Sequence, residues 1–126
     1  MIECGGHGNL ERPLWIIFKL VRSDQFREYF VNWKQPWYFP EQNETEQLLK
    51  KTGFRDIQVS LSKRITTFSD RQSFASFVKT VIMKPFLGYL PYNKRNHFLD
   101  VFLEEVEHSN WKWSLDNVRL NIFAKK

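Results

Sequence analysis

Only three segments of this chain have the residue pattern of a β-strand, and helical patterns separate them. The first, Met1–Cys4, runs straight into a glycine-rich loop, and the second alternates apolar and polar residues from Phe54 to about Thr67. The third alternates in the same way from Val118 to Lys125. Three strands are too few to wrap a doubly wound sheet, so the order predicts a small α/β fold. Without a linker, repeat or low-complexity tract, the 126 residues predict one continuous unit, residues 1–126.

The two longer strand patterns predict a specific pairing. We expect residues 57–66 to pair antiparallel with residues 117–125, each strand burying one face under helices. The apolar residues expected on these buried faces are Ile57, Val59 and Leu61 on one strand and Val118, Leu120 and Ile122 on the other.

Helical patterns fill the intervals between the strands. Pro13 suits the first turn of a helix over residues 11–21, whose nearly uniform apolar character indicates burial. Pro36 and Pro40 bracket an aromatic turn, and Pro85 is expected to end a helix that Asp70 caps. The remaining helices are expected over residues 25–33, 41–52 and 91–109, with Phe74, Phe77, Val78, Val81 and Ile82 as the apolar stripe of the helix that Asp70 caps.

Composition excludes several classes of protein. Nineteen Lys and Arg against 14 Asp and Glu give a net charge of +5, which favours anionic ligands but is too scattered for a nucleic-acid interface. No uncharged apolar run reaches the roughly 18 residues of a membrane span, and the start lacks a signal-peptide pattern. The single cysteine, Cys4, fits a reducing compartment, so we expect a cytoplasmic protein. Together with the scattered charge and the lack of a long apolar run, this predicts a protein that binds neither membrane nor nucleic acid.

The residues that commonly carry catalysis show no catalytic arrangement. His7, His97 and His108 have no metal-ligand spacing with one another or with Cys4, which predicts no metal site. Cys4 itself is expected to be a small buried thiol beside a strand end rather than a nucleophile. The carboxylates of residues 104, 105 and 107 fan across the outer face of a helix, where solvation is the expected role.

The segment Gly5-Gly6-His7-Gly8 has two interpretations. Glycines after a strand allow a tight turn that requires positive φ. They also allow backbone N–H groups to approach a phosphate or carboxylate, with His7 and Asn9 directed into a cleft. The segment lacks both the G-x-G-x-x-G spacing and a G-K-[ST] ending.

Two further segments combine aromatic and cationic residues. The block from Trp33 to Tyr38 is either a packed connector pinned by prolines or a surface on which a flat ring stacks. In the segment from Lys84 to Pro91, we expect a short rigid loop in which Lys84 and Tyr89, with the following Tyr92, offer a cation and hydroxyls to a substrate.

Taken in order, several motifs resemble a known enzyme family. They are Cys4-Gly5-Gly6-His7-Gly8-Asn9, Phe26-Arg27-Glu28-Tyr29-Phe30, Pro36-Trp37-Tyr38-Phe39-Pro40, Gln47-Leu48-Leu49-Lys50-Lys51-Thr52-Gly53-Phe54, Thr67-Phe68-Ser69-Asp70, Lys84-Pro85-Phe86-Leu87 and Leu120-Asn121-Ile122-Phe123-Ala124. The set, which spans almost the whole chain, resembles the C-terminal half of class I S-adenosylmethionine-dependent methyltransferases, close to the trans-aconitate methyltransferase group.

The resemblance implies the C-terminal portion of a Rossmann-like fold with about three strands and five helices. In that family the last of seven strands is antiparallel and lies between the fifth and the sixth. Residues 1–4, 55–67 and 117–125 then correspond to the fifth, sixth and seventh strands. Residues 70–109 correspond to a helical insertion that caps the substrate pocket.

The resemblance also implies a missing half. The family holds S-adenosylmethionine with the first four strands, a Gly-x-Gly-x-Gly loop and an acidic residue, none of which occurs here. We therefore expect a truncated methyltransferase domain that does not bind the cofactor alone and is inactive alone. Methyl transfer depends mainly on positioning, so no catalytic side chain is expected. For a small-molecule acceptor such as a carboxylate, the expected substrate-binding residues are Lys84, Tyr89, Tyr92, Arg95, Trp37, His7 and Asn9.

A second hypothesis is a non-enzymatic interaction module that uses an exposed sheet edge and aromatic surface. Whether the chain serves as an enzyme stays open, and its partner is either an N-terminal half or a second copy. A dimer is expected because the strand at Ile2–Cys4 lacks a neighbour and the helix at Leu14–Val21 would add uncovered apolar surface.

Overall fold

The computed structural model describes all 126 residues, which divide into two compact units. Unit 1 comprises residues 1–11, 37–66 and 116–126, and unit 2 comprises residues 12–36 and 67–115. Each unit is therefore assembled from segments that lie far apart in the sequence.

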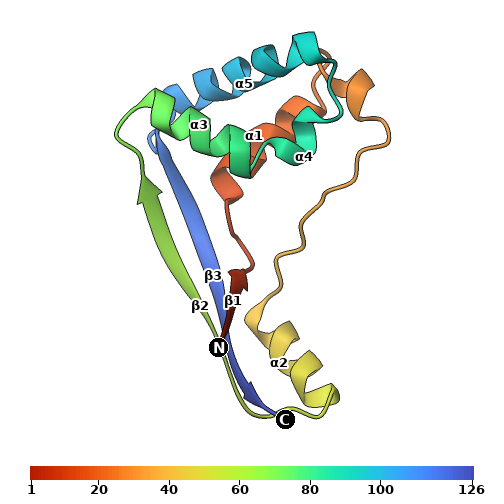
Figure 1. Cartoon of the computed structure of the whole chain (residues 1–126), viewed down its shortest axis with the longest axis vertical. Helices are drawn as coiled ribbons and strands as arrows, with labels where there is room; N and C mark the ends of the chain where they lie inside the picture. The colour runs from red at the N-terminus through yellow and green to blue at the C-terminus, as the bar shows by residue number, and fades with distance from the viewer. The chain divides into compact units, whose positions relative to one another are not determined.

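A three-stranded antiparallel sheet belongs mainly to unit 1 (Figure 1). The strands are β1 (Ile2–Gly5), β2 (Arg55–Thr67) and β3 (Ser114–Lys125), and their order is β1-β3-β2. β1 pairs antiparallel with β3, with Ile2 opposite Ile122 and Gly5 opposite Arg119. The predicted antiparallel pairing of the two long strands is confirmed, and the last strand lies in the middle, as the resemblance implies.

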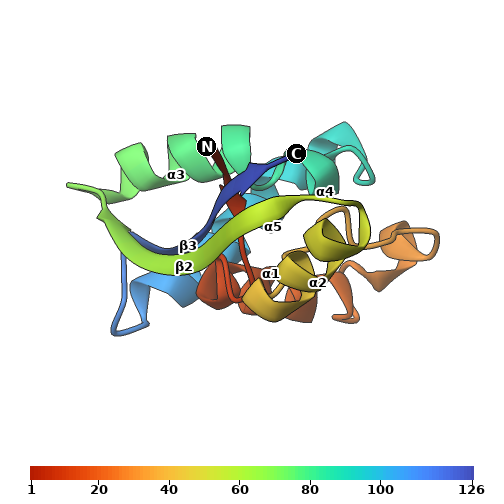
Figure 2. The same ribbon diagram turned by 90° about the horizontal axis from the view of Figure 1, so that it is seen from below.

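Side-chain hydrogen bonds on one face of the sheet join its two long strands. The Asn117 amide donates to the Thr66 hydroxyl at 2.7 Å, and the Asn121 amide donates to the Ser62 hydroxyl at 3.2 Å. Figure 2 shows β2 and β3 as one twisted pair over this length. This face of the pair is largely polar, whereas Val59, Val118 and Leu120 alternate to the other face.

The apolar face of the sheet is only partly covered by α2 (Gln42–Lys51). This helix confirms the predicted one: the Glu41 backbone N–H donates to Glu44 Oε1 at 3.1 Å, and Gly53 follows with φ of +92°. Val59 is buried, but Leu61 is 37% exposed and Ile57 is half-buried, so the prediction of a fully buried face is wrong. The ten residues of α2 form a helix about 15 Å long, whereas the thirteen residues of β2 span about 43 Å. The helix is therefore too short to cover the whole apolar face.

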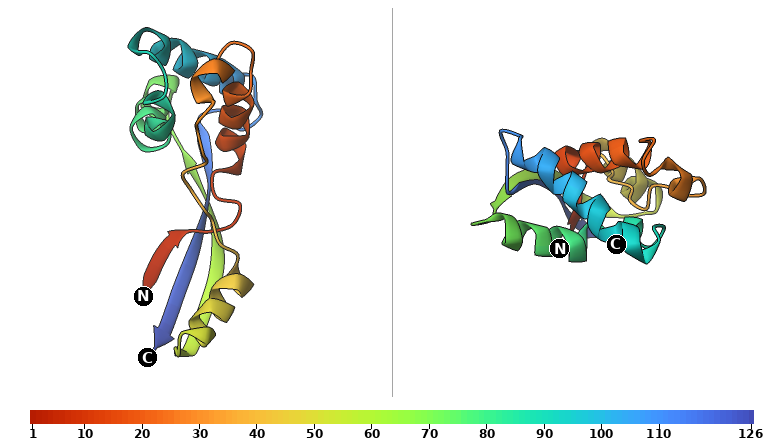
Figure 3. Two further views of the ribbon diagram at one scale, coloured as in Figure 1. Left: turned by 90° about the vertical axis from the view of Figure 1, so that its right-hand side faces the viewer. Right: turned by 90° about the horizontal axis from the view of Figure 1, so that it is seen from above.

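Unit 2 is a cluster of helices around an aromatic core. It contains α1 (Glu11–Val21), the 3₁₀ helix η1 (Arg27–Phe30), α3 (Arg71–Val81), α4 (Lys84–Leu87) and α5 (Tyr92–Glu107), seen from above in Figure 3. Its largest fully buried rings are Phe26, Phe74, Phe86, Phe98 and Phe102. The rings of Phe26 and Phe98 meet edge to face with centroids 4.9 Å apart. No helix of the structure has both the length and the apolar character that crossing a membrane requires.

Two predicted helix boundaries in unit 2 are wrong. The helix expected over residues 25–33 is only the single 3₁₀ turn η1, because aromatic residues of low helix propensity fill this short segment. The helix capped by Asp70 ends at Val81, and Pro85 lies in the first turn of α4. Proline is compatible with a first turn, since the N–H that it lacks would have no partner there. The segment from Lys84 to Pro91, which was expected to be a loop, therefore begins as a helical turn.

Three burial predictions are also corrected. Cys4 is exposed, because β1 lies at the edge of the sheet. Phe77 and Val81 lie on the exposed side of α3, whereas Phe74, Val78 and Ile82 are buried, because only one face of the helix contacts the core. The apolar residues of α1 are buried as predicted, except for the exposed Trp15 and the half-buried Phe18, so α1 supplies little of the uncovered apolar surface that the dimer prediction assumed.

Candidate functional site

A cavity of about 570 Å³ in unit 2 is lined by cationic and polar side chains. The end of α3, the short helix α4 and the first half of α5 form its walls. On α5 the lining residues have the spacing of one helix face, i, i+3, i+4 and i+7. The lining residues are Lys79, Thr80, Lys84, Leu87, Gly88, Tyr92, Arg95, Asn96 and Leu99.

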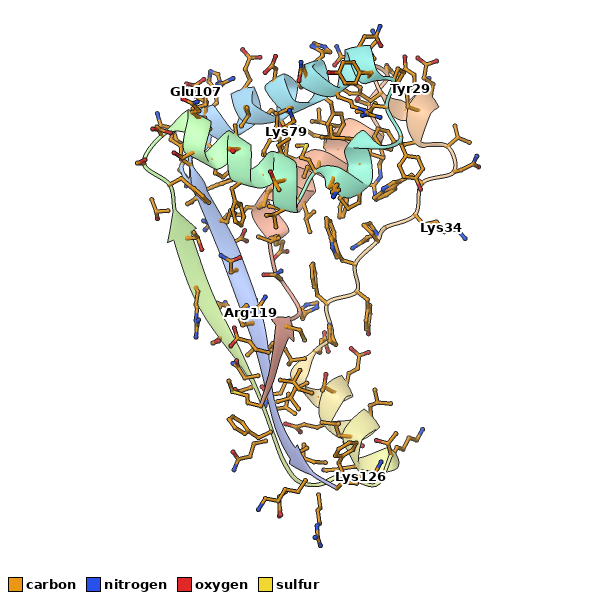
Figure 4. The ribbon with its side chains drawn as sticks, viewed as in Figure 1. Tyr29, Lys34, Lys79, Glu107, Arg119 and Lys126 are labelled. Atoms are coloured by element: carbon orange, nitrogen blue, oxygen red, sulfur yellow. The ribbon has the colours of Figure 1, made fainter.

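The charge of this cavity is entirely positive. Lys79, Lys84 and Arg95 line it, and no carboxylate does. None of the three forms an ion pair within the chain. Figure 4 marks Lys79 on α3. Such a cavity suits a small anion, because each cation keeps its charge available for a ligand.

Arg95 is the most firmly oriented of these cations. Its Nε donates to the Leu90 backbone carbonyl at 3.2 Å, and its guanidinium carbon lies 5.8 Å from the centre of the Tyr92 ring. The side chain is half-buried, whereas Lys84 is exposed. A guanidinium held by a carbonyl and a ring keeps its remaining N–H groups in a fixed direction, which favours planar recognition of a carboxylate.

The structure brings three of the seven predicted substrate-binding residues to this cavity, namely Lys84, Tyr92 and Arg95. Tyr89 does not line it, and its ring lies against Phe30 with centroids 5.9 Å apart. Lys79 and Asn96 were not predicted. Asn96 could have been found from its position one residue after Arg95 on the same helix face, whereas Lys79 reaches the cavity only through the turn between α3 and α4.

The other three predicted residues belong to unit 1. Trp37 stacks on Phe39 with centroids 6.4 Å apart, and His7 Nε2 lies 3.8 Å from Glu41 Oε1 with both side chains exposed. Asn9 is buried, and its Oδ1 accepts the backbone N–H of Val118 at 2.8 Å. Its carboxamide therefore connects the loop after β1 to β3.

A second cavity, of about 940 Å³, is an apolar groove in unit 1. It lies between β1, β3, the aromatic segment 38–40 and α2. The Tyr38 hydroxyl donates to Glu44 Oε2 at its rim, and this hydrogen bond raises the pKa of Tyr38. The groove is lined by Cys4, Gly5, Tyr38, Phe39, Pro40, Glu44, Thr45, Gln47, Leu48, Lys51, Leu120 and Ile122.

The glycine segment does not provide space for a cofactor. A Cβ at Gly5 would lie 2.9 Å from the Phe39 ring, and one at Gly6 would lie 2.5 Å from Leu61 Cδ2. Side chains of the protein therefore already fill the space that these glycines leave. Gly8 has φ of +88°, which supports the tight-turn interpretation. The chain's residues do not fit S-adenosylmethionine at this segment.

No cluster of three or more His, Cys, Asp or Glu side chains has the arrangement of a metal site.

The comparisons with known proteins identify no relative: no family model matches the chain, and neither does any curated protein. The geometry of the cationic cavity is therefore the main guide to function.

Proposed function

We propose that the chain is the acceptor-binding, C-terminal portion of an S-adenosylmethionine-dependent methyltransferase of Rossmann-like fold. In this proposal the cationic cavity of unit 2 holds a carboxylate of a small-molecule methyl acceptor. The observation that carries it is the lining of three unpaired cations without a carboxylate. Such a lining attracts an anion of a few carboxylate groups more strongly than a neutral molecule of the same shape.

Two features of the fold support the same proposal. Every residue that lines the cavity lies between positions 79 and 99, inside the segment 70–109 that the resemblance assigns to a cap over the substrate pocket. The strand order β1-β3-β2 is also the order that the resemblance implies for the last three strands.

Each of the lining residues would contribute to anion binding in a different way. Arg95 would donate hydrogen bonds to a carboxylate from its fixed guanidinium, while Lys79 and Lys84 would add charge on flexible stems. The Thr80 hydroxyl already donates to the Ser76 carbonyl at 2.9 Å, so it offers no proton to an anion. Tyr92 and Asn96 would supply the neutral donors. Because the glycine segment does not fit the cofactor, we assign the cofactor contacts to a separate N-terminal half, in a cytoplasmic enzyme.

Titration calorimetry with tricarballylate and succinate tests the cavity, with the neutral diamide of succinic acid as the ligand control. We expect both anions to bind unit 2 and the diamide not to bind. Arg95→Gln should weaken binding about tenfold, since one charge-assisted hydrogen bond contributes roughly 1.5–3 kcal/mol and 1.4 kcal/mol is tenfold.

Lys84→Gln should weaken binding less, because this side chain is exposed. Lys94→Gln is the matched control: it removes the same charge from the same helix at a position that does not line the cavity. Equal binding of the diamide, or equal losses in Arg95→Gln and Lys94→Gln, would contradict the proposed site.

The methyltransferase assignment needs a separate test. We expect the reading frame directly upstream of residue 1 to encode a segment with Gly-x-Gly-x-Gly. That segment, co-expressed with this chain, should transfer labelled methyl groups to a carboxylate acceptor, whereas neither part should do so alone. An upstream region without such a segment would refute the methyltransferase assignment, but it would not affect the proposal that the cavity binds an anion.

A second candidate function is a non-enzymatic interaction module. The observation that favours it is the apolar groove of unit 1, which adjoins the free edge of β1. An upstream segment of the methyltransferase kind would decide against this candidate, and its absence would favour it.

A further inference from the structure

The cationic cavity of unit 2 carries apolar surface as well as charge. Leu87 at the end of α4 and Leu99 on α5 line it, and both side chains are half-buried. Unit 2 contains seven leucines, and the other five are at most 5% exposed. The two leucines that keep accessible surface are therefore the two that line the cavity. The buried ones are Leu14, Leu20, Leu90, Leu103 and Leu115.

Each of the two lining leucines lies one helical turn from a cation on the same helix. Leu87 follows Lys84 by three residues on α4, and Leu99 follows Arg95 by four residues on α5. Side chains three or four residues apart lie on the same face of a helix, with Cβ atoms about 5–6 Å apart. Two walls of the cavity therefore have the same arrangement, a cation beside an apolar side chain.

The space next to Leu87 is open. Gly88 lines the cavity directly after this leucine, and a Cβ placed on Gly88 would meet no atom within 4 Å. Covering apolar surface with a hydrocarbon is favourable, because it removes both surfaces from water. The volume of about 570 Å³ lies within the range of pockets that hold small molecules, so a short hydrocarbon chain has room beside the leucines.

Only one of the three lining cations is held in a fixed direction. Arg95 donates to the Leu90 carbonyl, whereas Lys79 and Lys84 are exposed and carry their charge on flexible stems. The cavity therefore offers directed hydrogen bonds to one carboxylate. A second carboxylate one helical turn further along α5 would lie against Leu99, where it would lose water without gaining a partner.

We infer that the ligand of this cavity is an amphipathic monocarboxylate, with its carboxylate at Arg95 and a hydrocarbon chain over Leu87 and Leu99. The inference rests on the proposed function, because it names the class of the small-molecule acceptor. It concerns binding alone and uses the same cationic cavity.

Titration calorimetry on the unmodified chain tests this class of ligand. The probes are butanoate, hexanoate and octanoate, compared with the dicarboxylates hexanedioate and octanedioate. We expect the affinity of the monocarboxylates to rise about two- to fourfold with each CH₂ that the leucines cover, and the heat capacity change of binding to become more negative. Each dicarboxylate should bind more weakly than the monocarboxylate of the same length, because its second charge meets the leucines.

A pair of leucine substitutions tests where the hydrocarbon chain lies. Leu99→Asn keeps the size of the side chain but makes it polar, so the affinity should no longer rise with chain length, while butanoate should bind much as before. Leu48→Asn is the matched control, because Leu48 is 61% exposed and lines the separate apolar groove of unit 1. It should keep the dependence on chain length. Loss of that dependence in Leu48→Asn instead of Leu99→Asn would overturn the inference.

The calorimetry separates failure of this inference from failure of the proposed function. If no carboxylate binds, the cationic cavity is not an anion site, and both are wrong. If the affinity does not change with chain length, or if the dicarboxylates bind more tightly, the anion site stands and the amphipathic class is overturned. These measurements use the unmodified chain, so they decide the question even where Leu99→Asn fails to fold.

Discussion

The two units of this chain bury their apolar residues very differently. Three of the buried apolar side chains, Val59, Val118 and Leu120, lie in unit 1, and the other eighteen lie in unit 2. Unit 1 instead keeps an apolar groove of about 940 Å³ and a free strand edge. The stability of unit 2 therefore comes from a closed aromatic core, whereas unit 1 depends on backbone pairing and leaves apolar surface available for a partner.

The largest expected effect is on the free energy of unfolding, when a Phe→Ala substitution is made in each unit and the two losses are compared. Phe98→Ala in unit 2 removes a ring with no exposed surface and should lower the free energy of unfolding by about 3–5 kcal/mol. Phe123→Ala in unit 1 removes a ring that is 50% exposed and should change it by no more than about 0.5 kcal/mol. Urea unfolding followed by circular dichroism measures both, and similar losses would show that the units do not differ in this way.

A pair of glycine substitutions should give an intermediate effect, and here unit 1 should lose more stability than unit 2. Gly6→Ala in unit 1 places a Cβ against Leu61 and 3.2 Å from Leu120 Cβ, so we expect a loss of about 1–3 kcal/mol. Gly88→Ala in unit 2 meets nothing within 4 Å and has φ of −63°, which alanine adopts readily. It should leave stability unchanged or raise it by up to about 1 kcal/mol. A destabilised Gly88→Ala with an unaffected Gly6→Ala would contradict the described packing.

The smallest expected effect is a pH dependence confined to unit 2. The hydrogen bond from the Ser73 backbone N–H, at 2.8 Å, lowers the pKa of Asp70 from its ordinary value of 3.8. Because the pKa is lowered on folding, the stability that this carboxylate supplies is present above pH 3.8 and is lost as the pH falls through the lower folded value.

Asp70→Asn keeps an N-cap oxygen but removes the titration. We expect the wild-type chain to have the higher urea midpoint at pH 7, by about a few tenths of a molar, and this advantage to vanish near pH 2. An advantage that persists unchanged in acid would show that the Asp70 charge does not stabilise α3.

Local signals predicted the ends of several elements well. The acidic start, lysine-rich end and Gly53 of α2 act within one turn of the backbone, so their effect does not depend on the rest of the fold. Asp70 likewise caps α3 through a contact three residues away. Pro85 was misplaced because proline is compatible both with a helix end and with a first turn, and the sequence alone does not distinguish them.

The cationic cavity was predictable only in part. Lys84, Tyr92 and Arg95 lie within twelve consecutive residues, so their proximity could be expected from the chain itself. Lys79 joins them only because α3 ends at Val81 and the chain turns before α4. Asn9 could not be distinguished from a ligand-binding residue until its partner Val118, 109 positions away, was known.

By itself, the sequence determined most of the elements and the antiparallel pairing of the two long strands, because periodicity, caps and alternation act over a few residues. It also determined the net positive charge that favours an anion. Only the tertiary structure decided which apolar faces are covered, which cations share a cavity and which strand edge is free. Those properties depend on contacts between segments far apart in the chain, and no local pattern of residues encodes where such segments meet.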